Sequence, residues 1–238
     1  MSQYRDTAVV LRTWKLGEAD RIVVLFTEGH GKVRAVAKGV RKTKSRFGSR
    51  LEPPTQVALQ LHAGRSLDTI TQAETVDNYR LVREDLDRLN RAVSMLEAVD
   101  QLAVEGEPEP DLFRMLVRAL ALLATDDSPL VVPAFFLKAL GQTGFGPVVD
   151  SCVVCGSEGP LVAFDTERGG MLCGPHRQGL PVSAEAVDLV HKILGGSLGS
   201  ALAEPPSAAT GEVERLATSA LEHHLERRLR SPTVLHRS

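Results

Sequence analysis

Hydrophobic and polar residues alternate with the two-residue period of β-strands through the first third of the chain, from Tyr4 to about Asp77. Turn-forming residues separate five short segments that are rich in β-branched side chains. The pattern predicts strands at residues 7–11, 22–27, 33–37, 56–61 and 69–73. Five strands in about 75 residues, with a longer connection after the third, favour a small closed barrel of the oligonucleotide-binding (OB) type. Half of a β-sandwich is the alternative.

The apolar period changes to three and four residues from Leu81 onward, which is typical of amphipathic helices. One long helix is predicted from there through Leu102. A second is predicted over residues 112–124 with Asp111 as its cap, and a third over 131–140. Two late helices are predicted, together with a Gly- and Pro-rich link between them that we expect to be flexible: 183–194, 212–229 and the link 195–210. The expected fold class is therefore α+β, with a barrel domain at residues 1–78 and a helical domain at 79–238.

Charge is distributed unevenly along the chain. The formal net charge is −2, yet residues 1–80 hold 14 Lys or Arg against 8 Asp or Glu. Clustered cations repel one another, so an anionic partner, most often nucleic acid, is the natural reason for them. A solvated basic loop is the alternative. The cations that we predict to bind nucleic acid occur without one acidic residue between them: Lys32, Arg34, Lys38, Arg41, Lys42, Lys44, Arg46 and Arg50.

Composition narrows the class of protein. Apolar residues make up 43% and charged residues 24%, which is ordinary for a folded cytoplasmic protein. No apolar run approaches the roughly 20 residues of a membrane helix, so we expect no membrane partner. Aromatic residues are only 4% of the chain, and Phe47 is the one aromatic residue within the basic segment. Contacts to the phosphate backbone should therefore dominate over base stacking.

Two matched pairs of ligand residues form one strong chemical motif. The sequence reads Cys-x2-Cys-x17-Cys-x2-His, formed by Cys152, Cys155, Cys173 and His176. Thiolates two residues apart on a tight turn can both reach one Zn²⁺ at about 2.3 Å. Four protein ligands close the coordination shell, so the expected role is one structural zinc per chain in an insertion at about residues 148–180.

Motifs of an enzyme are missing from the sequence. It has neither a phosphate-binding loop nor the Gly-x-Gly-x-x-Gly fingerprint, and the zinc-deaminase signature is also absent. We therefore expect no catalytic residues and no small-molecule substrate. A zinc enzyme remains an alternative that would require an open coordination position.

Several stretches, taken in this order, resemble the RecO family of bacterial DNA repair and recombination proteins. They cover the second and third strands, the basic connection, and the approach to the cysteine motif: residues 20–27, 31–41, 44–47, 51–53, 139–147 and 152–156. The sequence departs from the family at the fourth metal ligand, where many zinc-bearing relatives have a cysteine and this chain has His176.

The resemblance implies a non-enzymatic, nucleoid-associated mediator. Such a protein binds single- and double-stranded DNA, anneals complementary strands, and acts with RecR to load RecA onto DNA coated by single-strand-binding protein. The acidic C-terminal tail of single-strand-binding protein would then contact the helical part, with Arg114, Arg118 or Lys138 as candidates. An RNA-binding OB-fold protein with a zinc ribbon is the alternative that charge and fold alone leave open.

Overall fold

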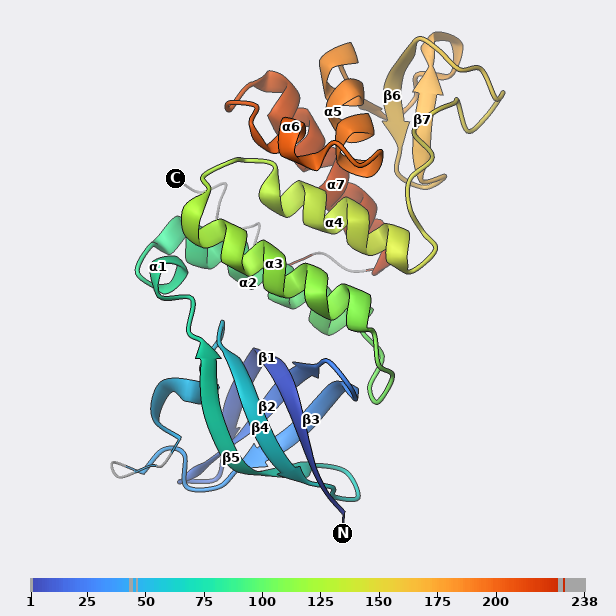
Figure 1. Cartoon of the computed structure of the whole chain (residues 1–238). Coiled ribbons are helices and arrows are strands. Elements are labelled where there is room, and N and C mark those ends of the chain that lie inside the picture. The colour runs from blue at the N-terminus through green and yellow to red at the C-terminus, as the bar shows by residue number, and fades with distance from the viewer. Residues whose placement is uncertain (1, 43–44, 46, 227–228, 230–238) are drawn as a thin grey trace. The chain divides into compact units, whose positions relative to one another are not determined.

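The chain folds into two compact units, one ending at Thr125 and the other beginning at Asp126, as a computed structural model describes for residues 2–42, 45, 47–226 and 229. The first unit holds a β-barrel and three helices, and the second holds four helices and a small β-sheet (Figure 1). The barrel and the helices that follow it are thus parts of one compact unit. Whether the barrel of residues 1–78 folds independently of the helices is a separate question, so the predicted domain boundary stays a prediction.

Five strands close into a barrel in the order β1-β2-β3-β5-β4. Neighbouring strands are antiparallel except for the parallel pair of β3 and β5, which closes the barrel. This order confirms the predicted OB-type barrel. Every strand is found where the alternation predicted it, and several run further: β1 (Gln3–Leu16), β2 (Asp20–Thr27), β3 (Gly31–Ala37), β4 (Gln56–His62) and β5 (Asp68–Asp77).

The barrel interior is filled by the apolar side chains of one face of each strand. On β3, Ala35 and Ala37 are fully buried while Arg34 is exposed, because successive side chains of a strand point to opposite faces. The short helix η1 (Gly48–Leu51) adds Leu51 to this core. Phe47, just before it, is also buried there, with 1% of its surface exposed.

The prediction of one long helix from Leu81 is wrong, because this segment forms two helices, α1 (Arg80–Arg83) and α2 (Leu86–Leu102). Asp85 takes an extended conformation, and its carboxylate accepts a hydrogen bond from the Arg88 backbone N–H at 2.9 Å. This N-cap gives the backbone an alternative to continuing the helix, and the apolar period does not reveal it.

The second helix, α3 (Pro110–Thr125), begins before the predicted cap. Asp111 lies inside its first turn and pairs with Arg114 at 2.6 Å, so the prediction that Asp111 is the cap is wrong. Helices α2 and α3 lie side by side against one end of the barrel (Figure 1). There the Phe113 ring of α3 packs against the Phe26 ring of β2, with centroids 6.0 Å apart.

The second unit begins with α4 (Val131–Gln142), which matches the third predicted helix. A three-stranded sheet and four helical segments follow it: β6 (Leu161–Asp165), β7 (Gly170–Cys173), η2 (Gly174–His176), β8 (Leu180–Pro181), α5 (Ala184–Leu194), α6 (Leu198–Leu202) and α7 (Ala208–His224). Helix α7 packs against both α4 and α5 and forms the core of this unit.

The link predicted to be flexible at residues 195–210 contains regular structure instead. It includes α6 and the first turn of α7, which begins four residues earlier than predicted. Ser207 and Thr210 form a reciprocal capping box, in which each side chain accepts a hydrogen bond from the other residue's backbone N–H. These two bonds satisfy donors at the helix start and fix the chain where its composition predicted a loose segment.

Among the helices of the described residues, none combines the length and the apolar character needed to cross a membrane.

Candidate functional site

The basic residues of β3 divide into two groups. Lys32 and Arg34 lie at the end covered by α2, where acidic residues meet them. The Lys32 ammonium donates to the Asp100 backbone carbonyl at 2.5 Å and lies 3.8 Å from its carboxylate. Arg34 pairs with Glu105 at 2.9 Å, and both of these side chains remain about half exposed. Much of the charge at this end is therefore neutralised within the protein.

The second group lies beyond the end of β3, where Lys38, Arg41 and Lys42 are exposed. The Arg41 guanidinium donates to the Glu18 backbone carbonyl at 2.8 Å, so this loop lies against the turn between β1 and β2. An arginine held by a backbone carbonyl keeps its full positive charge. Exposed cations therefore gather beside the β1–β2 turn.

The other predicted cations follow in the same connection. Arg50 lies in η1 and is exposed, with its guanidinium donating to the Phe47 carbonyl at 3.4 Å. Lys44 and Arg46 lie outside the described residues.

Phe47, the one aromatic residue of the basic segment, offers no stacking surface, because its side chain is buried in the barrel core. The structure instead places Trp14 on the outer face of β1, with 37% of its surface exposed. The Arg12 guanidinium lies over this indole, 5.0 Å from the ring centroid. The sequence does not reveal this placement, because the two-residue period that points Ala8 and Val10 into the barrel would also point residues 12 and 14 inward. The register shift of β1 after Val10 turns them outward, beyond the end of the predicted strand at residue 11.

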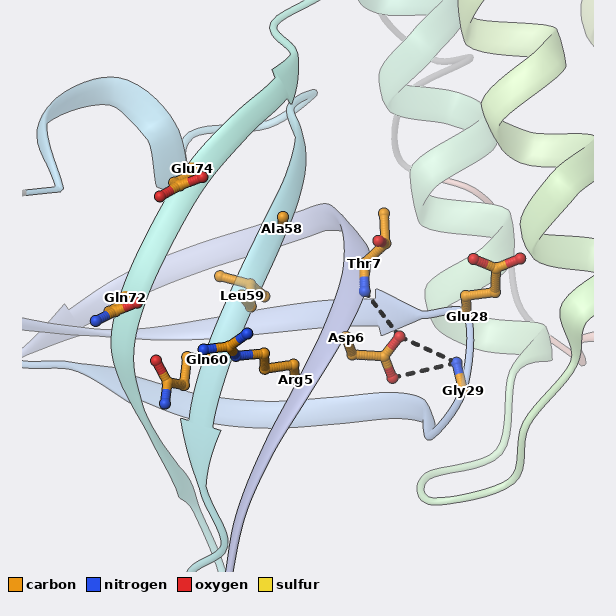
Figure 2. A pocket seen from close by; sticks show the side chains of 10 residues that line it. All are labelled: Arg5, Asp6, Thr7, Glu28, Gly29, Ala58, Leu59, Gln60, Gln72 and Glu74. Atoms are coloured by element: carbon orange, nitrogen blue, oxygen red, sulfur yellow. Dashed lines mark hydrogen bonds between the residues drawn. The ribbon is translucent and has the colours of Figure 1, made fainter.

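A polar depression of about 580 Å³ lies on the β1–β4–β5 side of the barrel (Figure 2). Its charged lining residues are Arg5, Asp6, Glu28 and Glu74. Figure 2 shows the Asp6 carboxylate accepting hydrogen bonds from the backbone N–H groups of Thr7 and Gly29, so Asp6 fastens the β2–β3 turn to β1. Three carboxylates against one guanidinium disfavour a phosphate backbone here.

Four potential metal ligands converge in the second unit. Cys152 and Cys155 lie on one turn, while Cys173 ends β7 and His176 ends η2. Their ligand atoms all lie within 4.8 Å of one another. The Cys155 and Cys173 sulfurs are 3.7 Å apart, and the His176 Nδ1 atom lies 3.7 Å from the Cys152 sulfur and 3.3 Å from the Cys173 sulfur.

These distances fit a tetrahedral metal site. A Zn–S bond of about 2.3 Å implies a sulfur-to-sulfur edge of about 3.8 Å, close to the 3.7 Å between the Cys155 and Cys173 sulfurs. The three cysteines are free thiols, so no disulfide competes for the sulfurs. The predicted residues are therefore brought together as a group that could hold a metal ion, and its chemistry is compatible with zinc.

The backbone around the cluster favours the thiolate form of Cys152. Burial of the Cys152 sulfur opposes its ionisation, but hydrogen bonds from the backbone N–H groups of Cys173, Val154 and Cys155 outweigh it and lower its pKa to about 6. Burial raises the pKa of Cys173, and hydrogen bonds with the other two thiols raise it further. Neighbouring thiols thus resist ionising together unless a cation joins them, as a divalent metal would.

The turns that present these ligands are fixed by backbone hydrogen bonds. The Gly156 N–H donates to the Cys152 carbonyl at 2.8 Å, with Gly156 in the left-handed region at φ +73°. The Val153 N–H donates to the Met171 carbonyl at 3.0 Å, which ties the first cysteine turn to β7.

The three candidates for contact with an acidic peptide lie in different units. Arg114 and Arg118 are exposed and four residues apart, so they share one face of α3. Lys138 is half-buried on α4 of the second unit.

Comparisons with known proteins agree over the whole chain. A family model described as "Recombination protein O N terminal" matches residues 1–79, and one described as "Recombination protein O C terminal" matches residues 83–233. A protein of Frankia casuarinae named DNA repair protein RecO is 45% identical over 245 residues, and the match covers all of both chains.

Proposed function

The chain belongs to the RecO family of DNA repair and recombination proteins, and on this basis we propose that it is a recombination mediator that acts without catalysis. In this proposal it binds single- and double-stranded DNA and anneals complementary strands. With RecR it helps RecA to load onto DNA coated by single-strand-binding protein. We place this activity in the cytoplasm, at the nucleoid.

The observation that carries the DNA-binding proposal is the group of exposed cations beside the β1–β2 turn of an OB barrel. Lys38, Arg41 and Lys42 are exposed, with Arg41 held only by backbone carbonyls, whereas Lys32 and Arg34 already meet carboxylates. Binding to phosphates releases counterions, so affinity should fall steeply with salt and depend little on sequence. Annealing follows because neutralising cations lower the repulsion between two strands held on one surface.

A charge-reversal experiment tests this proposal. We expect Lys38→Glu, Arg41→Glu and Lys42→Glu together to weaken binding of labelled DNA by at least about tenfold at moderate salt, and to slow annealing. The matched control reverses three exposed arginines elsewhere, Arg65, Arg80 and Arg215, with the same change in net charge. Equal affinity of the two variants would contradict the proposal. Competition with RNA of the same sequence separates it from an RNA-binding function.

We propose one structural Zn²⁺ held by Cys152, Cys155, Cys173 and His176. Bound there, the metal would supply folding free energy by joining the first cysteine turn to the end of β7. Four protein ligands leave no position for a reactive water, which agrees with a protein that is not an enzyme.

Contact with the acidic tail of single-strand-binding protein is proposed for the exposed face of α3. Arg114 and Arg118 provide two cations there, with Asp111 beside the first. A labelled tail peptide should bind at low salt, and Arg118→Glu should weaken that binding. No binding of the peptide to the unmodified protein would remove this partner.

A further inference from the structure

One surface of the barrel combines an exposed aromatic ring with cations. Arg12, Trp14 and Leu16 lie on the outer face of β1, because a register shift follows Val10 and the strand continues beyond it. Trp14 and Leu16 have 37% and 38% of their surface exposed. An exposed tryptophan on a strand face is an uncommon use of a side chain that normally contributes to a core.

The neighbouring strands extend this surface into an apolar row. Trp14 lies opposite Ile22 of β2, and Ile22 lies opposite Val36 of β3. Both of these aliphatic side chains are half-buried. The indole therefore stands at one edge of a row that crosses three strands, and it is the part of that row most accessible to a ligand.

Cations flank the apolar row. In the next row along the strands, Arg12 and Arg34 lie on either side of Val24. On the other side, exposed Lys38 follows the end of β3. The Arg12 guanidinium, 58% exposed, lies over the indole and pairs with Asp100 at 2.5 Å. The pair with Asp100 anchors the arginine that orients the ring.

We propose that Trp14 is a base-stacking residue that lets the barrel distinguish single-stranded DNA from duplex DNA. This inference rests on the proposed DNA-binding function and assigns a role that the cations alone do not supply. Phosphates of both forms meet the same cations, but only unpaired bases offer a free π-face to an indole. In a duplex those faces are already stacked on neighbouring base pairs.

The flanking charge favours nucleic acid over an apolar protein segment as the occupant. A strand that places its bases on the row would have its phosphates near exposed Lys38, and near Arg12 and Arg34, which also pair with Asp100 and Glu105 but keep about half of their side-chain surface exposed. The depression on the opposite side of the barrel has no aromatic residue in its lining and is rich in carboxylates (Figure 2). It therefore offers neither a ring for the bases nor positive charge for the phosphates.

Trp14 is the only tryptophan of the chain, so its intrinsic fluorescence reports on this surface alone. We would titrate the full-length protein with an oligothymidine, an abasic phosphodiester of the same length and a duplex, and follow binding independently by anisotropy of end-labelled DNA. Oligothymidine should quench the fluorescence strongly. The abasic strand and the duplex should bind with little quenching.

Variants give a second measurement. Trp14→Ala should weaken oligothymidine binding by about 5- to 100-fold and leave duplex and abasic binding within about twofold. Trp14→Phe should lie between, because a smaller ring still stacks. The control is Leu86→Ala, which removes an exposed apolar side chain from α2 and should change none of these affinities.

The outcomes separate this inference from the DNA-binding proposal. Anisotropy that shows oligothymidine binding without a change in tryptophan fluorescence would overturn the role of Trp14 and leave DNA binding intact. The role of Trp14 would also be overturned if Trp14→Phe and Trp14→Ala weakened the binding of duplex and of single-stranded DNA equally. No binding of any DNA would instead refute the proposed function. The titration of the unmodified protein needs no variant to fold.

Discussion

Lys32 of β3 and Asp100 of α2 are joined twice, by a hydrogen bond of 2.5 Å from the ammonium to the Asp100 backbone carbonyl and by an approach of 3.8 Å to its carboxylate. The same carboxylate also pairs with Arg12 of β1. One mostly buried acidic side chain therefore links two strands of the barrel to the helix that covers its end.

Replacing this carboxylate should destabilise the first unit. We expect Asp100→Asn to lower the free energy of unfolding by about 1–3 kcal/mol, because Arg12 loses its charged partner and Lys32 keeps only the backbone carbonyl beside a mostly buried side chain. Urea denaturation followed by Trp14 fluorescence would measure it. Glu84→Gln, which breaks an exposed pair with Arg80, should cost less than about 0.5 kcal/mol. Equal losses for the two variants would contradict the linking role.

Removing the acid that meets Arg34 should strengthen DNA binding. In Glu105→Gln the guanidinium loses its anionic partner, which lies at 2.9 Å, and its charge becomes available to a phosphate. The slope of log affinity against log salt should then become steeper by up to about 0.9 for duplex DNA. Glu107→Gln removes the same charge two residues away and keeps the Arg34–Glu105 pair, so it serves as the control. Identical slopes for the two variants would refute direct competition between Glu105 and phosphate.

Loss of a ligand should release the metal and loosen the segment around it. We expect about one Zn²⁺ per chain in the unmodified protein, and much less in His176→Ala. Affinity should also fall as pH is lowered, since protons compete with the metal for thiolates and imidazole. The control is His191→Ala, because the His191 Nε2 atom lies 3.0 Å from the Val149 carbonyl, outside the cluster.

Hydrogen exchange would locate the effect. His176→Ala should raise exchange rates in β6 and β7 and leave the barrel strands unchanged. Full zinc content in His176→Ala would remove the histidine from the ligand set.

A side chain at Gly31 should be far more damaging than one at Gly17. Both glycines have positive φ, +65° and +59°, so alanine costs about 1–2 kcal/mol of backbone strain at either. At Gly31 a Cβ would also lie 1.9 Å from the Glu107 carbonyl oxygen, whereas at Gly17 it would meet nothing within 4 Å. Urea midpoints of Gly31→Ala and Gly17→Ala separate the steric clash from the backbone strain. Similar midpoints would show that the chain after α2 can shift away from the new Cβ at little cost in free energy.

Local sequence patterns were enough to predict most of the secondary structure and the candidate metal ligands of this protein. Strands and most helices follow from the spacing of apolar residues, because burial on one face of an element imposes its period on the sequence. Cys152, Cys155, Cys173 and His176 could be identified for a similar reason, since two-residue spacing within each pair is a local requirement of a shared metal ion. The family resemblance also rested on such short ordered segments.

Tertiary structure decided which charges and rings are available. Asp100 is 68 residues from Lys32, so no local pattern could show that it neutralises a cation of the basic segment. Phe47 and Trp14 are both aromatic residues near cations, yet one fills the barrel core and the other remains on its surface. Which aromatic residue is buried depends on how the strands close and on where the register of β1 shifts. Both depend on contacts between segments far apart in the chain, and those contacts exist only once the barrel has formed.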